Sequence, residues 1–251
     1  MLNAVFNFAL YQYADRTEDG VITDNPVLVL TQTRGWFASK RRRSKITHKQ
    51  LPHWFNAVKA LRNRAYNSIE IPVKHYLLLV LFTGLRRDEA APLIWEDAAT
   101  SEALNKREVS YMSLKDKILF IDKTKNGIEH VLPLSDYIYE LFTAYRNINP
   151  SRFVFPGLGG HSYIKEPRKI MAKVATASKM QHFILHDLRR TFATMANEIG
   201  IPAYTIKRLL NHKTASSDVT AGYIIDDVEY LRDPVNRIAN YILEIAHQEN
   251  G

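Results

Sequence analysis

VKHYLLLVLFTGLRRDEAAPL, the stretch from Val73 to Leu93, decides the fold of this chain. Its first ten residues are apolar almost all round, and such a helix is stable only where other elements cover it on every side. Thr83 and Gly84 predict the end of that helix, and Arg86 starts a second, shorter helix. The sequence therefore predicts a buried central helix, with Arg86 held on a rigid element where that helix stops.

Amphipathic helices are predicted on both sides of the central helix. Thr47 and Gln50 have the spacing of a capping box. The apolar residues that follow recur on one helical face: Leu51, Trp54, Phe55, Val58 and Leu61. Further helices are predicted to start at Ser135 and to cover residues 167–177, 186–199, 202–210 and 235–246.

Three segments between residues 109 and 134 have the composition of strands. VSYMSL, KILFID and EHVLPL are rich in β-forming residues and are separated by turn residues. This pattern is typical of a small antiparallel sheet. Together with the helices, it predicts an α+β domain that is mainly α-helical and carries a small antiparallel β-sheet.

The charge and the composition indicate a polyanionic partner. Lys and Arg number 34 against 26 Asp and Glu among 251 residues, giving a net charge of +8, and such a field attracts nucleic acid. The absence of cysteine excludes disulfides, thiolate nucleophiles and cysteine-bound zinc. The longest apolar run, Tyr76 to Phe82, is too short to cross a bilayer, and the first residues lack the features of a signal peptide. We therefore expect a cytoplasmic chain with no membrane partner.

The segment HDLRRTFATMANEIG, residues 186–200, presents an imidazole and a guanidinium together. His186 and Arg189 lie three residues apart and share one face of the predicted helix. Arginine donates paired hydrogen bonds to two phosphate oxygens, and histidine supplies a further donor. The pair is therefore suited to a phosphate, and a surface histidine beside a solvated arginine is the alternative interpretation.

The same region also has the spacing of a helix-turn-helix. Ala196, Gly200 and Ile206 match the small residue, the turn glycine and the buried aliphatic residue of that motif. Residues 202–210 are then a recognition helix, whose exposed readers are Tyr204, Lys207 and Arg208. This alternative predicts a DNA-binding module in place of an enzyme, and a plain helical hairpin is a third interpretation.

Two further stretches supply charged groups for phosphate chemistry. Glu89 follows Arg86 by one helical turn and is positioned to orient its guanidinium, or, together with Asp88, only to favour the helix N-terminus. Lys123 and Lys125 flank the predicted hairpin turn in IDKTKNG, where an ammonium group can approach a leaving oxygen. Lysines at turns also serve solubility alone, so both interpretations stay open.

Five motifs in order give the chain a family resemblance. TGLRRDEA, KTKNG followed by LPL, HDLRRTFAT, LLNH and DVTAGY resemble the tyrosine recombinases, specifically phage-type integrases, over about residues 47–225. The resemblance implies the tyrosine recombinase catalytic-domain fold. It also implies a site-specific DNA recombinase that cuts and rejoins DNA through a covalent 3′-phosphotyrosine, without cofactor, metal or ATP.

The resemblance assigns roles to particular residues. It implies a catalytic set of Arg86, Lys125, His186, Arg189, His212 and Tyr223. The two arginines clamp the scissile phosphate, Lys125 protonates the leaving oxygen with Lys123 as the fallback, and Tyr223 is the nucleophile, with Tyr230 as a weaker competitor. Glu89 is a supporting residue. The expected DNA contacts are Arg41, Arg42, Arg43, Lys123, Arg190, Lys207 and Arg208.

The domain boundaries follow from the resemblance and from the composition. We expect residues 1–30 to be the remnant helix and tail of a truncated core-binding domain, because a single helix cannot bury its own apolar face. Residues 31–46 are expected to form a basic linker, either a solvated tether or a DNA contact. Residues 47–251 are expected to form the catalytic domain, including a C-terminal helix. The apolar stripe of that helix packs either on its own domain or on a neighbouring subunit.

The implied partners are those of an integrase. They are double-stranded DNA attachment sites, other protomers in a synaptic tetramer, and accessory DNA-bending proteins, in the cytoplasm or nucleoid of a bacterial host. Two alternative functions remain. One is a helix-turn-helix regulator with a vestigial catalytic set, and the other is a relaxing activity of the type IB topoisomerase kind.

Overall fold

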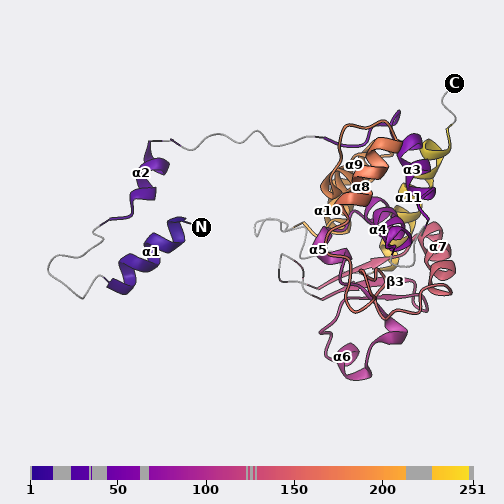
Figure 1. Cartoon of the computed structure of the whole chain (residues 1–251), viewed down its shortest axis with the longest axis horizontal. Coiled ribbons are helices and arrows are strands. Elements are labelled where there is room, and N and C mark those ends of the chain that lie inside the picture. Colours follow the sequence, from indigo (N-terminus) through magenta and orange to yellow (C-terminus); the bar gives the residue numbers. More distant parts are fainter. Residues whose placement is uncertain are drawn as a thin grey trace. The chain divides into compact units, whose positions relative to one another are not determined.

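The chain forms two compact units, residues 1–43 and 44–251. The computed structural model describes residues 2–13, 24–33, 35, 44–62, 68–122, 124, 127, 129–212 and 228–248 (Figure 1). Among the described residues, no helix has the length and apolar character needed to cross a membrane.

The described residues of the first unit form two helices, α1 (Leu2–Tyr13) and α2 (Pro26–Gln32). Asn25 caps α2 by accepting from the Val27 amide at 3.0 Å, and its side-chain amide donates to Asn3 Oδ1 on α1 at 2.7 Å. The predicted helix near the N-terminus is confirmed. A second helix, α2, begins within the residues expected to form a tail, because asparagine at the cap and proline at the first position start a helix.

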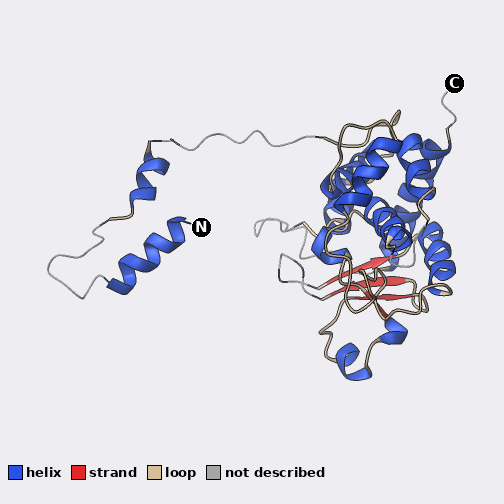
Figure 2. Ribbon diagram, in the orientation of Figure 1, coloured by secondary structure: helices blue, strands red, loops and turns tan. Residues whose placement is uncertain are grey.

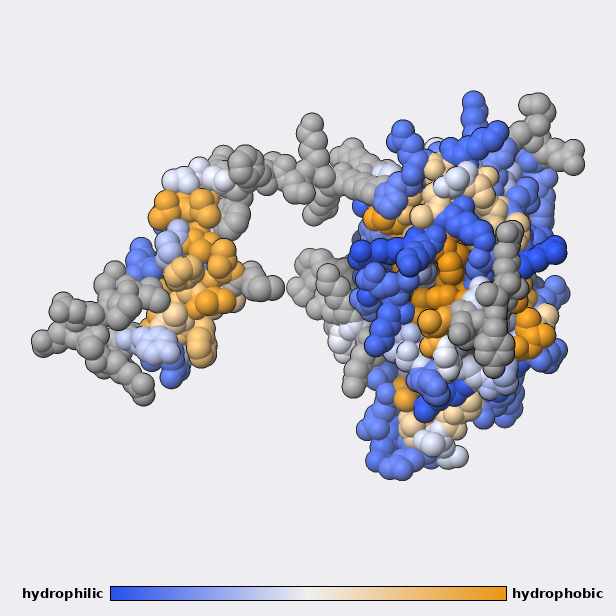
Figure 3. All heavy atoms as spheres, viewed as in Figure 1, coloured by the Kyte–Doolittle hydropathy of each residue, from blue (hydrophilic) through white to orange (hydrophobic). Residues whose placement is uncertain are grey.

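The first unit leaves a row of apolar side chains exposed. They recur every third residue on α1 and are Leu2, Val5, Phe8 and Tyr11. Figure 3 shows apolar residues, in orange, gathered over these two helices. Two short helices offer too little surface to cover one another fully.

The second unit is built around α4 (Glu70–Thr83), the helix predicted to be central. From Pro72 to Thr83 every residue of α4 except Lys74 is buried. Helices packed against it include α3 (Leu51–Lys59), α9 (Leu185–Glu198) and α11 (Arg232–His247). The all-apolar surface of α4 therefore has the complete cover that its sequence demands.

The other described helices lie around this core, except α6, which lies on the far side of the sheet (Figure 1). They are α5 (Arg87–Ala90), α6 (Ser101–Asn105), α7 (Asp136–Arg146), α8 (Arg168–Ala177) and α10 (Ala203–Leu209), with 3-10 turns η1 (Glu96–Ala98) and η3 (Glu229–Leu231). Ser135 caps α7 as predicted, accepting from the Ile138 amide at 3.4 Å. In α11 the predicted apolar stripe is buried within this unit, against α3, α4 and α9.

The second unit contains a four-stranded sheet, and most of the helices lie on one side of it (Figure 2). Its order is β1 (Ile94–Trp95), β2 (Tyr111–Ser113), β3 (Ile118–Ile121) and β4 (His130–Pro133). The three predicted segments pair antiparallel as expected. The sheet is nevertheless mixed, because β1 pairs with β2 in parallel after a crossover through η1 and α6. The prediction of a purely antiparallel sheet is therefore wrong at this edge.

Candidate active site

The site begins where α4 ends. Gly84 ends the helix in the left-handed conformation, with φ of 67°, which glycine adopts without strain. A Cβ at this position would lie 2.6 Å from Leu210 Cδ2 and 2.8 Å from Phe192 Cδ1. Glycine therefore lets the end of α4 lie directly against α9 and the end of α10.

Arg86 is fixed by Glu89 immediately after this turn. The buried Glu89 carboxylate accepts from the Arg86 amide at 2.9 Å and from Arg86 Nη1 at 2.7 Å. Glu89 thus both caps the first turn of α5 and orients the guanidinium, so the two interpretations of its role hold together. Arg86 Nη2 also donates to the Asn211 carbonyl at 3.5 Å.

Arg189 is buried on α9 and bonds to the backbone of two other elements. Its Nη1 donates to the Gly84 carbonyl and its Nη2 to the Leu210 carbonyl. Burial, followed by the positive charge of Arg86, lowers the pKa of Arg189 to about 10, and Glu89 opposes this shift. The guanidinium remains charged at neutral pH and joins the ends of α4 and α10.

The sequence LLNH ends α10 in a Schellman motif. The Asn211 amide donates to the Arg208 carbonyl and the His212 amide to the Lys207 carbonyl, each at 2.9 Å. Asn211 takes a positive φ of 45°, a conformation that asparagine tolerates better than most residues. The backbone of His212 is therefore fixed three residues beyond the last residue of α10.

The two predicted histidines lie within the field of the two arginines. Burial lowers the pKa of His186, and the charges of Arg190, Arg189 and Arg86 lower it further. Burial likewise lowers the pKa of His212, together with the charges of Arg189 and Arg86 and with His186. We call Arg86, His186, Arg189 and His212 the cationic cluster. At neutral pH it offers two charged guanidiniums and two neutral imidazoles to an anion.

His130 is a residue of this region that the sequence did not single out. It is buried on β4, and its Nε2 bonds to the Leu209 carbonyl at 3.1 Å. Burial lowers the pKa of His130 to about 4, and the charges of Arg189 and Arg86 act in the same direction. The available signal was the strand alternation of EHVLPL, which puts His130 and Leu132 on one buried face.

The sequence of the chain matches a known protein family. Residues 44–227 match the sequence profile of the phage integrase family. The chain belongs to the phage integrase family. Prophage integrase IntF of Escherichia coli K12 is 30% identical to it over 203 residues, which are 79% of this chain and 39% of that protein. The chain thus spans about two fifths of the length of this curated relative.

Solved structures of integrase-family recombinases share the fold. The XerH recombinase bound to difH has a TM-score of 0.58 at 15% identity, covering 84% of this chain and 56% of that one. The integrase of mycobacterium phage Brujita has a TM-score of 0.51 at 19% identity, covering 98% of this chain and 75% of that one. The Tn1549 transposon integrase in complex with circular intermediate DNA has a TM-score of 0.53 at 11% identity. The match covers 88% of this chain and 84% of that one. The predicted tyrosine recombinase catalytic-domain fold is therefore confirmed.

Several predicted site residues of this family member lie outside the described residues. They are Arg41, Arg42, Arg43, Lys123, Lys125 and Tyr223. Of the predicted catalytic and supporting residues that are described, the structure brings together Arg86, His186, Arg189 and His212, and it places Glu89 beside Arg86.

The predicted DNA contacts that are described differ in exposure. Arg190 Nη1 bonds to the buried Asp187 at 3.2 Å and to the Ser44 carbonyl at 3.4 Å. Asp187 also accepts from the Ser44 hydroxyl at 2.8 Å. On α10, Lys207 is exposed, whereas Arg208 and the helix-turn-helix reader Tyr204 are partly buried.

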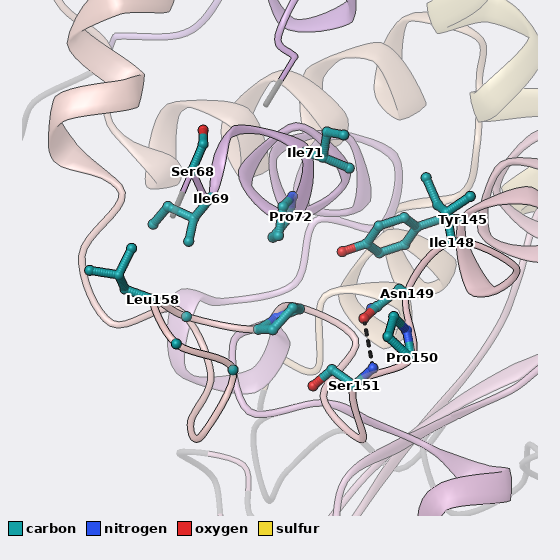
Figure 4. Close-up of a pocket in the computed structure, with 14 residues that line it drawn as sticks. Ser68, Ile69, Ile71, Pro72, Tyr145, Ile148, Asn149, Pro150, Ser151 and Leu158 are labelled. Carbon is teal, nitrogen blue, oxygen red and sulfur yellow. Dashed lines mark hydrogen bonds between the residues drawn. The ribbon is translucent and has the colours of Figure 1, made fainter. Parts of the chain in front are cut away.

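Two hollows lie in the second unit, one beside the site and one at the other end of α4. A cleft of 640 Å³ beside His186 has basic lining residues, among them Arg87, Lys165, Arg168 and His182. A hollow of 460 Å³ lies between the start of α4, the end of α7 and residues 156–160 (Figure 4). Its walls are largely apolar, and the polar Asn149 accepts from the Ser151 amide at 3.1 Å. Nowhere in the described part of the chain do three His, Asp or Glu side chains group closely enough to hold a metal ion.

Proposed function

We propose that the chain acts as a site-specific DNA recombinase that cuts and rejoins DNA through a covalent 3′-phosphotyrosine. The observation that carries this proposal is the pair of guanidiniums, Arg86 and Arg189, bonded to successive carbonyls at the end of α10. Phosphoryl transfer depends mainly on positioning and on stabilising negative charge. Two fixed cations beside two imidazoles meet that requirement.

The arginines bind the non-bridging oxygens of the scissile phosphate. Arginine has five N–H donors, and the bonds to Gly84 and Leu210 occupy two of those of Arg189. Arg86 has a quarter of its side chain exposed, which supports direct contact with DNA. Each guanidinium therefore combines an anchored side with donors for the phosphate.

Proton transfer is assigned to neutral and cationic groups around this clamp. Because their pKa values are lowered, His186 and His212 are neutral at pH 7 and each carries one donor and one acceptor nitrogen. His186 assists proton removal from the nucleophile, and His212 donates to the phosphate. Lys125, with Lys123 as the fallback, protonates the leaving 5′ oxygen.

Tyr223 is the proposed nucleophile. The phenol of tyrosine has a reference pKa near 10, so it needs cations or a base to become a competent nucleophile at neutral pH. In this proposal the cationic cluster supplies them. The phenolic oxygen forms a bond to phosphorus, the bond to the 5′ oxygen breaks, and that oxygen leaves as a hydroxyl with a proton from the lysine. Attack by a 5′ hydroxyl on the phosphotyrosine reverses the step and rejoins the DNA, so no external energy source is required.

The proposed partners follow from this reaction. The substrates are double-stranded attachment sites, and exchange between two duplexes calls for several protomers in a synaptic tetramer with accessory DNA-bending proteins. The proposed setting is the cytoplasm of a bacterial host.

Covalent capture tests the proposal. A pool of nicked duplexes with a randomised central sequence is incubated with the chain, and SDS-resistant adducts are isolated and sequenced. Tyr223→Phe is expected to abolish the adduct. Tyr230→Phe, a control at the exposed competing tyrosine on η3, is expected to retain it.

The outcomes separate the alternatives. An adduct that persists in Tyr223→Phe and disappears in Tyr230→Phe reassigns the nucleophile. Binding without any adduct favours the DNA-binding regulator. Relaxation of supercoiled DNA without strand exchange between duplexes indicates a topoisomerase activity instead.

A further inference from the structure

Three successive backbone carbonyls at the end of α10 accept hydrogen bonds from three different elements. The Leu209 carbonyl accepts from His130 on β4, and the Leu210 carbonyl accepts from Arg189 on α9. The Asn211 carbonyl accepts from Arg86 at the start of α5. Figure 1 shows α5, α9 and α10 on the same side of the second unit. We call these three bonds the carbonyl clamp.

The clamp meets a general need of helix ends. The last carbonyls of a helix lack partners within it and carry partial negative charge, so cationic or polar donors stabilise them. Two of the donors, Arg86 and Arg189, belong to the cationic cluster and are charged. The third donor, His130, is neutral at pH 7 because burial lowers its pKa to about 4. Since a carbonyl only accepts, its Nε2 must carry the proton.

His130 has no place in the proposed chemistry, yet its bond acts on the site. It holds Leu209, three residues before His212, and joins the sheet to the helix that leads to that histidine. The Schellman motif makes the backbone from Lys207 to His212 one rigid piece. A shift of Leu209 therefore moves both the His212 imidazole and the carbonyls that anchor the arginines.

We propose that His130 is a positioning residue, which fixes the end of α10 so that His212 and the two anchored arginines meet the phosphate in register. This inference rests on the proposed function of the cationic cluster. His130 acts through the Leu209 carbonyl and does not contact DNA. Small displacements of positioned groups cost about a hundredfold in rate in enzymes, which sets the scale of the expected effect.

Two amide substitutions separate the hydrogen bond from the bulk of the side chain. In His130→Gln the amide nitrogen reaches about as far as Nε2, whereas in His130→Asn it stops short by one methylene. Both variants place a neutral, polar amide at the buried position, and they differ by a single methylene. The matched control is His75→Asn. His75 is also a buried histidine whose pKa burial lowers to about 4, and it bonds to a carbonyl of its own helix, Ile71, at 2.8 Å.

The first measurement needs neither DNA nor cleavage. Amide hydrogen exchange is followed at Asn211 and His212, with the amides of α9 as the control for overall folding. We expect exchange at the end of α10 to be at least about tenfold faster in His130→Asn than in His130→Gln or His75→Asn, with α9 unchanged. Equal exchange in the two His130 variants overturns the inference, and so does equal acceleration along α9.

The second measurement separates binding from chemistry. On a captured suicide duplex, His130→Asn is expected to form the adduct about tenfold to a hundredfold more slowly, with DNA affinity within about twofold of the original. His130→Gln and His75→Asn are expected to stay within about threefold in rate. Equal rates for the Asn and Gln variants overturn the positioning role. If the unaltered chain forms no adduct, the proposed function fails, while the exchange measurement still decides whether His130 fixes α10.

Discussion

The tripeptide Leu-Arg-Arg occurs twice in this chain, at residues 85–87 and 188–190. In each copy the leucine is buried and the first arginine bonds to a carbonyl at the end of α10. The second arginine lies beside a carboxylate, Asp88 in one copy and Asp187 in the other. The tripeptide therefore makes the same three kinds of contact at two different elements.

We call the first arginine of each tripeptide, Arg86 and Arg189, the inner arginine, and the second, Arg87 and Arg190, the outer arginine. The two inner arginines differ in how their charge is compensated. Arg86 forms an ion pair with Glu89 and is a quarter exposed, whereas Arg189 is 4% exposed and bonds to neutral carbonyls. A carbonyl neutralises no charge, so Arg189 brings the stronger field to an anion. The position in the helix causes the difference, because Arg86 caps α5 and Arg189 lies inside α9.

The largest effect is expected at Arg189. Arg189→Lys should slow adduct formation by at least about a thousandfold, since an ammonium cannot bridge the Gly84 and Leu210 carbonyls and still face the phosphate. Leaving those carbonyls unpaired should also cost about 1–3 kcal/mol of unfolding free energy, measured in urea. Arg190→Lys is the control and should stay within about threefold in rate. A lysine at residue 189 that retains a tenth of the rate would contradict the two-carbonyl anchor.

The ion pair of Arg86 should matter less. Glu89→Gln keeps the size of the side chain and removes its charge, so the guanidinium loses its partner, and adduct formation should slow about tenfold. DNA affinity should rise slightly, because a negative charge beside the phosphate is lost. Asp88→Asn, beside the exposed Arg87, should change neither quantity by more than about twofold. A fall in affinity for Glu89→Gln would argue against Arg86 as the DNA-facing arginine.

A smaller effect is expected on the pKa values of the histidines. Arg189→Met should raise the pKa of both His186 and His212, because each loses a nearby positive charge. Arg190→Met should raise chiefly that of His186, on which its charge acts. Each change should stay below about one unit, equal to ~1.4 kcal/mol. Titration of the imidazole C–H signals by NMR measures the pKa values of His186 and His212. An equal rise of the His212 pKa in the two variants would contradict the distinction between inner and outer arginines.

The outer arginines should affect DNA binding alone. Arg87→Gln and Arg190→Gln should each lower the slope of log affinity against log salt by about one, the value for one lost phosphate contact. Rates at saturating DNA should remain unchanged. Fluorescence anisotropy at several salt concentrations checks the slopes. If the rate of adduct formation falls by more than the DNA affinity, that arginine contributes to the reaction as the inner arginines do.

Chelation should have no effect. In the proposed mechanism the arginines supply the charge that a metal ion provides in many phosphoryl transfer enzymes. Adduct formation in excess EDTA should therefore match that in its absence, and loss of the adduct would refute the metal-free mechanism.

Local patterns predicted much of the fold. The apolar surface of α4, Gly84 at its end and the apolar face of α3 follow from periodicity and from cap chemistry, which depend only on neighbouring residues. The same is true of His186 and Arg189, which share a helical face. Their proximity to Arg86 followed from the family resemblance and not from spacing.

The elements that were missed depend on distant contacts. Helix α2 has a local start signal, Asn25 followed by Pro26, but it is only seven residues long and its cap residue is also held by Asn3 and Asn7 on α1. Strand β1 has two residues and pairs in parallel across a crossover, which leaves no periodic pattern. His130 bonds to a carbonyl 79 residues away. No local pattern in the sequence encodes such partners.

The hydroxyl of Ser44 and the amide of Ile46 anchor the beginning of the second unit to α9. They donate to Asp187 at 2.8 Å and to Thr191 at 2.9 Å, on either side of Arg189. Any mechanical load on the backbone at Ser44 is therefore borne first by the helical turn that carries His186 and Arg189. Tension applied at Ser44 is therefore transmitted to the cationic cluster.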